Sequence, residues 1–119
     1  MKILYRILLN EAKDPEGRHI APCDGYKPEH PLVQSYSGTM LMVGKHDNTK
    51  QDELGICETL FEMFNINHPK DYRNRSMCVG DVVVIEFDTD NVVAYACDRF
   101  GFKMIEVPAG MTSLTAGRV

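Results

Sequence analysis

The most distinctive chemistry in the sequence is a short basic segment built around one tyrosine: Lys70, Tyr72, Arg73 and Arg75. Arginine forks bind phosphates and carboxylates, and a tyrosine ring can stack on a base. Arg99, with Lys103, adds to this set if the last hairpin folds back toward the segment. The pattern predicts a site for a ligand such as a nucleotide, or for a partner. The alternative is a solvated connection, because exposed charges beside Asp71 contribute little.

Sequence signatures of catalysis are missing from the chain. It contains no G-x-S-x-G, no H-E-x-x-H, no Walker-type G-K-[ST] and no G-x-G-x-x-G. The four histidines are scattered through segments of loop-like composition. We therefore predict a protein that is not an enzyme. The alternative left open is a Cys–His nucleophile pair assembled in space.

No metal site or other cofactor is expected. Zinc ligands usually come in two close pairs, and the nearest approach here is the single spacing His19-x-x-x-Cys23. The other cysteines lie within apolar patterns and are predicted to be buried thiols: Cys57, Cys78 and Cys97. Asp88 and Asp90 place two carboxylates together, as hard cations require. A hairpin turn explains that pair better, since the rest of a calcium loop is missing.

Composition limits the classes of protein that this chain can be. Its 119 residues are 44% hydrophobic and 25% charged, which is typical of one globular domain. A net charge of −4 argues against a general nucleic-acid coat. No apolar run approaches the roughly 20 residues of a membrane span, and the apolar start is interrupted by Arg6. We expect a cytoplasmic protein that does not act in a membrane.

The first half of the chain predicts two strands separated by an irregular stretch. Residues 2–9 are apolar at nearly every position, which favours a central strand covered on both faces. Residues 10–31 hold four prolines and two glycines, so we expect no regular helix there. Residues 32–43 predict a second strand with Val33 and Ser35 on one face, Tyr36 on the other, and a bulge or turn at Gly38.

The clearest helix covers about residues 50–65. Asn48 or Thr49 can cap its start, and Pro69 prevents its continuation. Its apolar positions recur at spacings of three and four: Leu54, Cys57, Leu60, Phe61 and Phe64. Such a stripe indicates a face packed on the core.

The second half predicts strands at 82–87, 92–97 and 102–107, with Gly80-Asp81 as a turn into the first of them. We expect an α+β fold in which a small curved antiparallel sheet has one main helix, about 50–65, packed across it. Residues 1–107 form this single domain, with the Pro-rich loop at 10–31. Residues 108–119 are expected to be a flexible tail.

Several runs of the second half, up to Ile105, resemble the YodL-like domain. They are Phe61 to Arg73, Ser76 to Val84, Tyr95 to Asp98 and Phe100-Gly101-Phe102, and an N-terminal strand with the pair Tyr5-Arg6 also fits. The resemblance implies a small domain of the kind found on mobile elements of Firmicutes, and it implies no particular activity. The chain departs from the family pattern in residues 10–31 and at Met77-Cys78.

Two functional hypotheses follow from these observations. The first is a non-enzymatic binding protein of a phage or mobile element, in one form a counter-defence inhibitor, that engages a host protein. Its acidic charge would steer it to a basic partner. The second is a protein that binds or sequesters a nucleotide, in one form as an oligomer, through residues 70–75 and Arg99.

Overall fold

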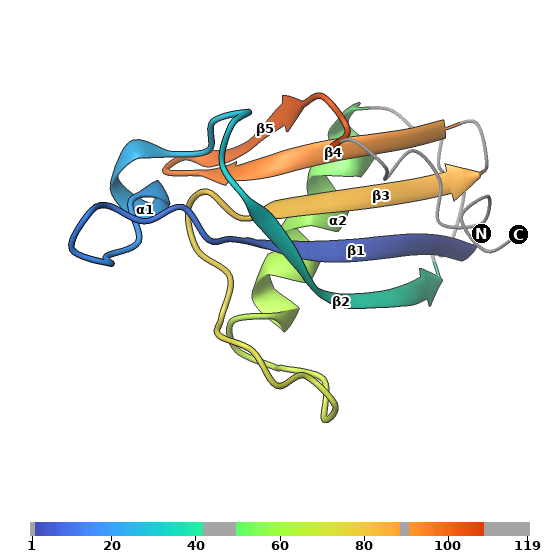
Figure 1. The fold of residues 1–119 in the computed structure, drawn as a ribbon. Coiled ribbons are helices and arrows are strands. Elements are labelled where there is room, and N and C mark those ends of the chain that lie inside the picture. The colour runs from blue at the N-terminus through green and yellow to red at the C-terminus, as the bar shows by residue number, and fades with distance from the viewer. Residues whose placement is uncertain (1, 42–49, 89–90, 109–119) are drawn as a thin grey trace, which may run out of the picture.

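In the computed structural model, five strands form one antiparallel sheet in the order β2-β1-β3-β4-β5, and the helix α2 crosses one face of it (Figure 1). The structure describes residues 2–41, 50–88 and 91–108. The elements are β1 (Lys2–Asn10), α1 (Ala21–Asp24), β2 (Leu32–Leu41), α2 (Lys50–Met63), β3 (Val82–Asp88), β4 (Asn91–Asp98) and β5 (Gly101–Ile105). The predicted α+β class, with one main helix across a small sheet, is confirmed.

Strand β1 lies inside the sheet, between β2 and β3, as its nearly continuous apolar sequence predicted. Ile3 and Ile7 point to the face that α2 covers, and Leu8 points to the other face. All three side chains are fully buried. A strand with both faces covered needs apolar residues at both parities, which explains why β1 shows no alternation.

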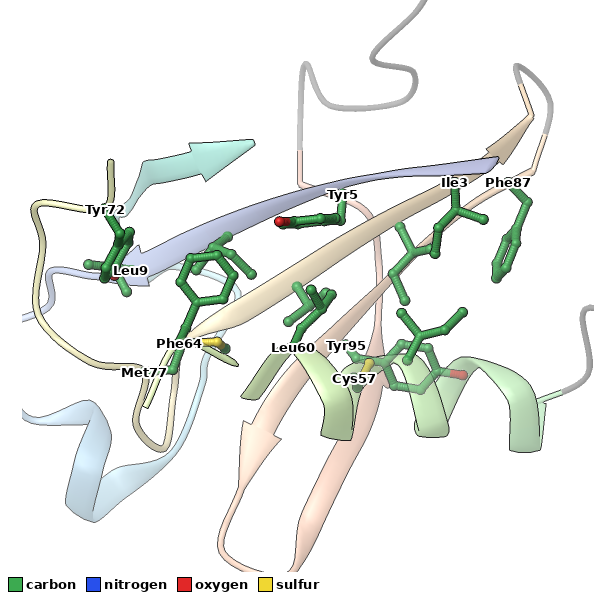
Figure 2. Close-up of a cluster of buried hydrophobic side chains, with 14 residues drawn as sticks. Ile3, Tyr5, Leu9, Cys57, Leu60, Phe64, Tyr72, Met77, Phe87 and Tyr95 are labelled. Carbon is green, nitrogen blue, oxygen red and sulfur yellow. The ribbon is translucent and has the colours of Figure 1, made fainter. Parts of the chain in front are cut away.

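The larger core cluster lies between α2 and the sheet (Figure 2). Cys57, Leu60 and Phe64 of the predicted stripe are fully buried, and they pack among side chains of β1, β3 and β4. This core also encloses a polar pair: the Tyr95 hydroxyl donates a 2.6 Å hydrogen bond to Glu53 Oε1. The sequence places Glu53 in the first helical turn, but its burial follows only from the way α2 docks on β4.

A smaller apolar cluster covers the opposite face of the sheet. It consists of Leu8, Val82, Val84, Ala94 and Ala96, with Tyr26, Leu32, Val92, Ile105 and Val107 packed around them. Tyr26 comes from the Pro-rich stretch, so that stretch contributes to the fold as a partial cover for this face. The cover lets β3 be apolar at every position from Val82 to Ile85.

The predicted face pattern of β2 is wrong because the bulge lies at a different residue. Pairing with β1 shifts register between Ile7 and Leu8, which leaves Ser35 as the extra residue in β2. The bulge reverses the alternation, so Tyr36 reaches the α2 side and packs at 5.2 Å from the Phe64 ring. Gly38 is not the bulge; it makes room for the Tyr5 ring, whose hydroxyl would lie 2.8 Å from a Cβ there.

The Pro-rich stretch contains one helical turn, α1, where no regular helix was expected. Pro22 lies in the first turn of α1, where its missing N–H would have no helical partner. Gly25 ends the turn with a φ of 79° and donates to the Ala21 carbonyl. Prolines exclude long helices, but they fit the first turn of a short one.

The remaining boundaries agree with prediction to within one or two residues. The last strand, for example, ends at Ile105 instead of residue 107. Some of the predictions fall outside the described residues: those for residues 42–43, Asn48 and Thr49, Asp90, and residues 109–119 of the expected tail. Within the described residues, no helix is long and apolar enough to cross a membrane.

We predict that Gly80→Ala destabilises the fold far more than Gly17→Ala. Both glycines have positive φ, 96° and 82°, which costs a residue with a Cβ about 1–2 kcal/mol. At Gly80 the new Cβ would also lie 2.3 Å from the Ala21 Cβ, whereas at Gly17 it meets nothing within 4 Å. Urea unfolding should separate the two variants by more than about 1 kcal/mol. Equal losses would show that the contact between α1 and Gly80 does not constrain the fold.

Candidate functional site

A buried carboxylate, that of Asp81, holds the end of β1 and the start of β3 together. Asp81 is fully buried at the residue before β3. Its oxygens accept two hydrogen bonds from the Arg75 guanidinium, at 2.7 and 2.9 Å. They also accept the backbone N–H groups of Asn10 and Cys78, each at 2.8 Å. Four donors satisfy the charge that burial would otherwise make very costly.

Asn10 extends this network into the Pro-rich stretch. Its side-chain amide donates to the Gly80 carbonyl at 3.1 Å and lies 3.0 Å from His30 Nδ1, while its Oδ1 accepts the Ala12 N–H at 2.9 Å. The same His30 nitrogen accepts the backbone N–H of Lys27 at 3.2 Å. The network therefore fixes where the chain leaves β1 and where it returns toward β2.

Arg75, predicted as a ligand-binding residue, is committed to this network. Besides the Asp81 pair, its guanidinium donates to the carbonyls of Asn10 and Ser76, each at 3.0 Å. The hydrogen bond to Asp81 raises the pKa of Arg75 still further, so the group stays charged. An arginine with these partners stabilises the fold and has few N–H donors left to bind a phosphate.

Tyr72 is buried, and neither of its ring faces is open to stack on a base. The ring packs at 4.9 Å from Phe64, 6.0 Å from Tyr36 and 5.1 Å from His68, measured between ring centroids. Its hydroxyl donates to the Arg75 carbonyl. Tyr72 thus belongs to the aromatic edge of the core, where edge-to-face packing favours these rings.

The exposed cations of the basic segment are Lys70 and Arg73. The Arg73 guanidinium donates to the carbonyls of Lys70 and Tyr72 within its own loop. The segment packs along β2, where Tyr36 donates to Asp71 at 2.9 Å and Asn74 donates to the Ser35 carbonyl at 3.3 Å. These contacts place the segment at the β2 edge of the sheet.

Arg99 lies at the opposite edge of the sheet, in the turn between β4 and β5. Its guanidinium donates to the Cys23 carbonyl at 2.7 Å and so joins the hairpin to α1. The five-stranded sheet separates β2 from β5 by four strand spacings, or about 19 Å. The structure therefore brings Lys70 and Arg73 together with the buried Tyr72 and Arg75, and it does not bring Arg99 to them.

The hollow that the structure does form lies at the β5 edge, on the sheet face away from α2. It has a volume of about 590 Å³, within the usual range for ligand sites. We call it the groove. Its floor is made by β4 and β5, one wall by the end of α1 and the residues after it, and one end by the segment after β5. It is lined by Asp24, Gly25, Tyr26, Pro28, Ala96, Cys97, Asp98, Lys103, Ile105, Glu106, Val107 and Pro108.

The charges that line the groove are largely without partners. Asp24, Lys103 and Glu106 carry no side-chain hydrogen bond or ion pair within the part of the chain that the structure describes. In the described part of the chain, the Asp98 carboxylate accepts one hydrogen bond, from the N–H of Arg99 at 2.8 Å. Three carboxylates and one ammonium give the lining a net charge of −2. Partial burial raises the pKa of the Tyr26 hydroxyl, and the nearby Glu106 raises it further.

The cysteines divide into one exposed thiol and three with raised pKa. Cys23 is exposed on α1, Cys57 and Cys97 are buried, and Cys78 is half-buried. Burial raises the pKa of Cys57 and of Cys97 to about 12 and also raises that of Cys78. No group of three or more potential metal ligands occurs among residues 2–41, 50–88 and 91–108.

Sequence reasoning missed the groove and the Asp81 network. Gly80-Asp81 was interpreted only as a turn into a strand, and Asn10 as the start of a loop. The available signal was a polar residue next to each of two apolar strands: Asn10 at the end of β1 and Asp81 directly before β3. Their partners lie up to 71 positions away in the sequence, so only the pairing of β1 with β3 reveals them.

The chain is a small α+β domain, and the family model of the YodL-like domain matches residues 33–107. The chain belongs to the YodL-like domain family, as its motifs predicted. Comparison with curated proteins and with solved structures found no significant match. The matched range includes the floor of the groove, but not β1 or the wall formed by residues 24–28.

We predict that Arg75→Ala lowers the free energy of unfolding by about 3 kcal/mol. The reason is that the fully buried Asp81 would lose its charged partner. Arg73→Ala is the matched control, because Arg73 is exposed and its hydrogen bonds within the described residues stay in its own loop. Its effect should remain within about 0.5 kcal/mol. Chemical denaturation of both variants tests the difference. A loss at Arg73 equal to that at Arg75 would contradict the structural role of Arg75.

We also predict that alkylation at pH 8 modifies Cys23 first, while Cys57 and Cys97 react only as the chain unfolds. Thiolates are the reactive form, and burial disfavours them. Because folding raises the pKa of both thiols, the free energy of unfolding keeps its full value below pH 9, the ordinary pKa of a thiol. It then falls progressively as the pH rises toward 12. Mass spectrometry after increasing times of alkylation gives the order in which the cysteines are modified. Cys23→Ser is the control and should lack the first modification. Fast labelling of Cys97 in the folded chain would contradict its burial.

Proposed function

We propose that this domain is a non-enzymatic binding protein of a phage or mobile element, and that it engages a cytoplasmic host protein through the groove. The observation that carries the proposal is a set of charges, mostly carboxylates, that have no ion-pair partner in the described part of the chain and that line the groove beside the apolar side chains of Ile105 and Val107. Binding sites combine apolar lining with a few polar groups that fix orientation. A net acidic lining on a chain of net charge −4 suits a basic surface of a partner.

A protein partner fits the groove better than a nucleotide does. Phosphate binding depends on several cations or N–H donors, and Lys103 is the one cation in the described lining, outnumbered by three carboxylates. In the basic segment, the Tyr72 ring is buried and the Arg75 guanidinium is paired with Asp81. A nucleotide at residues 70–75 would therefore have to be held by Lys70 and Arg73.

A binding role also suits the state of the titratable groups. A nucleophilic cysteine needs a lowered pKa or an adjacent base, and three of the four thiols have a raised pKa instead. Burial likewise raises the pKa of Tyr5 to about 12, with Tyr36 and Asp71 adding to the shift. These shifts point away from proton transfer near neutral pH.

The family supplies the biological setting of the proposal. The resemblance to the YodL-like domain implies a protein of a mobile element, and we infer that a small acidic protein of such an element acts on a component of its host. We therefore propose inhibition of a host defence protein as the role, with the groove as the contact surface.

We predict that Asp24→Lys/Glu106→Lys abolishes capture of the host partner. The tagged wild-type chain and the variant are expressed in the host, and co-purifying proteins are quantified by mass spectrometry. The variant reverses two unpaired carboxylates of the groove, so recovery of the partner should fall by at least about tenfold. Glu58→Lys/Glu62→Lys, two exposed carboxylates of α2, makes the same charge change outside the groove and should leave recovery within about twofold.

Two results would contradict the proposal. Loss of the partner with Lys70→Glu/Arg73→Glu, but not with the groove variant, would place the site at the basic segment. A native mass spectrum of the purified chain with the added mass of a nucleotide, absent from the denatured spectrum, would favour the small-ligand hypothesis. We expect the mass of the chain alone in that spectrum.

A further inference from the structure

The groove borders a strand that has an open side. Strand β5 is the last in the sheet order, so one row of its backbone groups faces away from β4. The other edge of the sheet is partly covered, because the Ser35 carbonyl of β2 accepts the Asn74 side chain. Within the described residues, no backbone hydrogen bond beyond those of the sheet reaches β5.

The backbone groups of β5 that face outward can be identified from β4. Both the N–H and the C=O of Cys97 point toward β3, bonding the Asp81 carbonyl at 2.8 Å and the Gly80 N–H at 2.9 Å. Directions alternate along a strand, so Ala96 and Asp98 point toward β5, where they pair with Lys103 and Gly101. The intervening residues Phe102 and Met104 then direct their N–H and C=O groups to the open side.

We propose that an extended segment of the partner pairs with the open edge of β5 and carries two basic side chains that enter the groove. This inference rests on the proposed function and names the partner's chemistry and its mode of binding. Addition of a strand to a sheet edge is a recurring form of peptide recognition, in which main-chain hydrogen bonds give affinity and side-chain pockets give specificity.

Charge complementarity identifies the occupant. Along the groove, Asp98 of β4 pairs with Gly101 at the start of β5, Lys103 lies at the centre of β5, and Glu106 follows its last residue. A segment with basic side chains at both ends of a five-residue stretch, and a neutral or acidic one between them, matches this order.

A second copy of the chain fits this edge poorly. In the symmetric antiparallel pairing of two β5 strands, the central residue Lys103 would face Lys103 of the other copy. Non-hydrogen-bonded pairs bring side chains closest, and like charges opposite each other are destabilising. A lysine on an edge strand commonly prevents such self-association.

The test uses the substitution Met104→Pro. Proline removes the N–H that faces the open side, and it leaves the hydrogen bonds between β4 and β5 in place, so an edge strand tolerates it. Met104→Thr is the matched control, because it changes the side chain and keeps the N–H. The probe is a peptide of alternating valine and threonine with lysine at both ends of its central five-residue stretch, titrated into the isotope-labelled full chain and followed by amide shifts.

We expect the lysine peptide to shift the amides of Phe102 and Met104 in the wild-type chain. Met104→Pro should weaken binding by at least about tenfold, and Met104→Thr should stay within about twofold. On the wild-type chain, a peptide with N-methyl groups on its pairing face should not bind, and a peptide with glutamate in place of lysine should bind at least about tenfold more weakly. These two peptides keep the test decisive if Met104→Pro does not fold.

Three results would overturn the inference. Equal binding by the proline and threonine variants, or by the N-methylated peptide, would place the segment over the face of the sheet and not on its edge. If the glutamate peptide binds as tightly as the lysine peptide, the partner's side chains in the groove are not basic. A dimer in the native mass spectrum that Met104→Pro disrupts would make a second copy the occupant. If Met104→Pro keeps the host partner and the groove variant loses it, the proposed function stands and strand pairing fails.

Discussion

Burial of the Asp81 carboxylate sets the conditions for the rest of the fold. A fully buried charge must be matched by donors, and here they come from three places: the end of β1, the loop before β3 and the Arg75 side chain. Satisfying Asp81 therefore requires β1 to lie beside β3 and the α2–β3 connection to fold back on both. The aromatic packing of Tyr72 follows from this, because its position is tied to the Arg75 carbonyl.

Local patterns predicted the elements well, since each depends on residues close in sequence. The unbroken apolar run of β1 indicated a central strand, and the spacing of Cys57, Leu60 and Phe64 indicated the buried face of α2. The face pattern of β2 failed at Ser35, because a bulge is a property of two paired strands and one strand's sequence does not determine it. The same limit applies to Glu53, whose burial depends on Tyr95.

The candidate site was harder to predict for a related reason. Cations clustered in sequence, such as Arg73 and Arg75, are easily interpreted as a ligand site. Their partners in the fold decide which of them can bind a ligand, and the Arg75 guanidinium already forms an ion pair with Asp81. The groove, in contrast, joins Asp24, Asp98 and Glu106 from three separate segments, none of which is distinctive alone. Composition predicted an acidic protein, and topology determines where its acid groups converge.

The division of the groove between two parts of the chain bears on its specificity. Its floor comes from β4 and β5, which lie within the region that matches the YodL-like domain, while Asp24 and Tyr26 lie outside it. The Pro-rich stretch that carries this wall is also where the chain departs from the family pattern. Arg99 and the Asn10–His30 contact attach the stretch to the domain at two points. A common strand edge would then supply affinity through the backbone, and the attached wall would select the side chains of this chain's own partner.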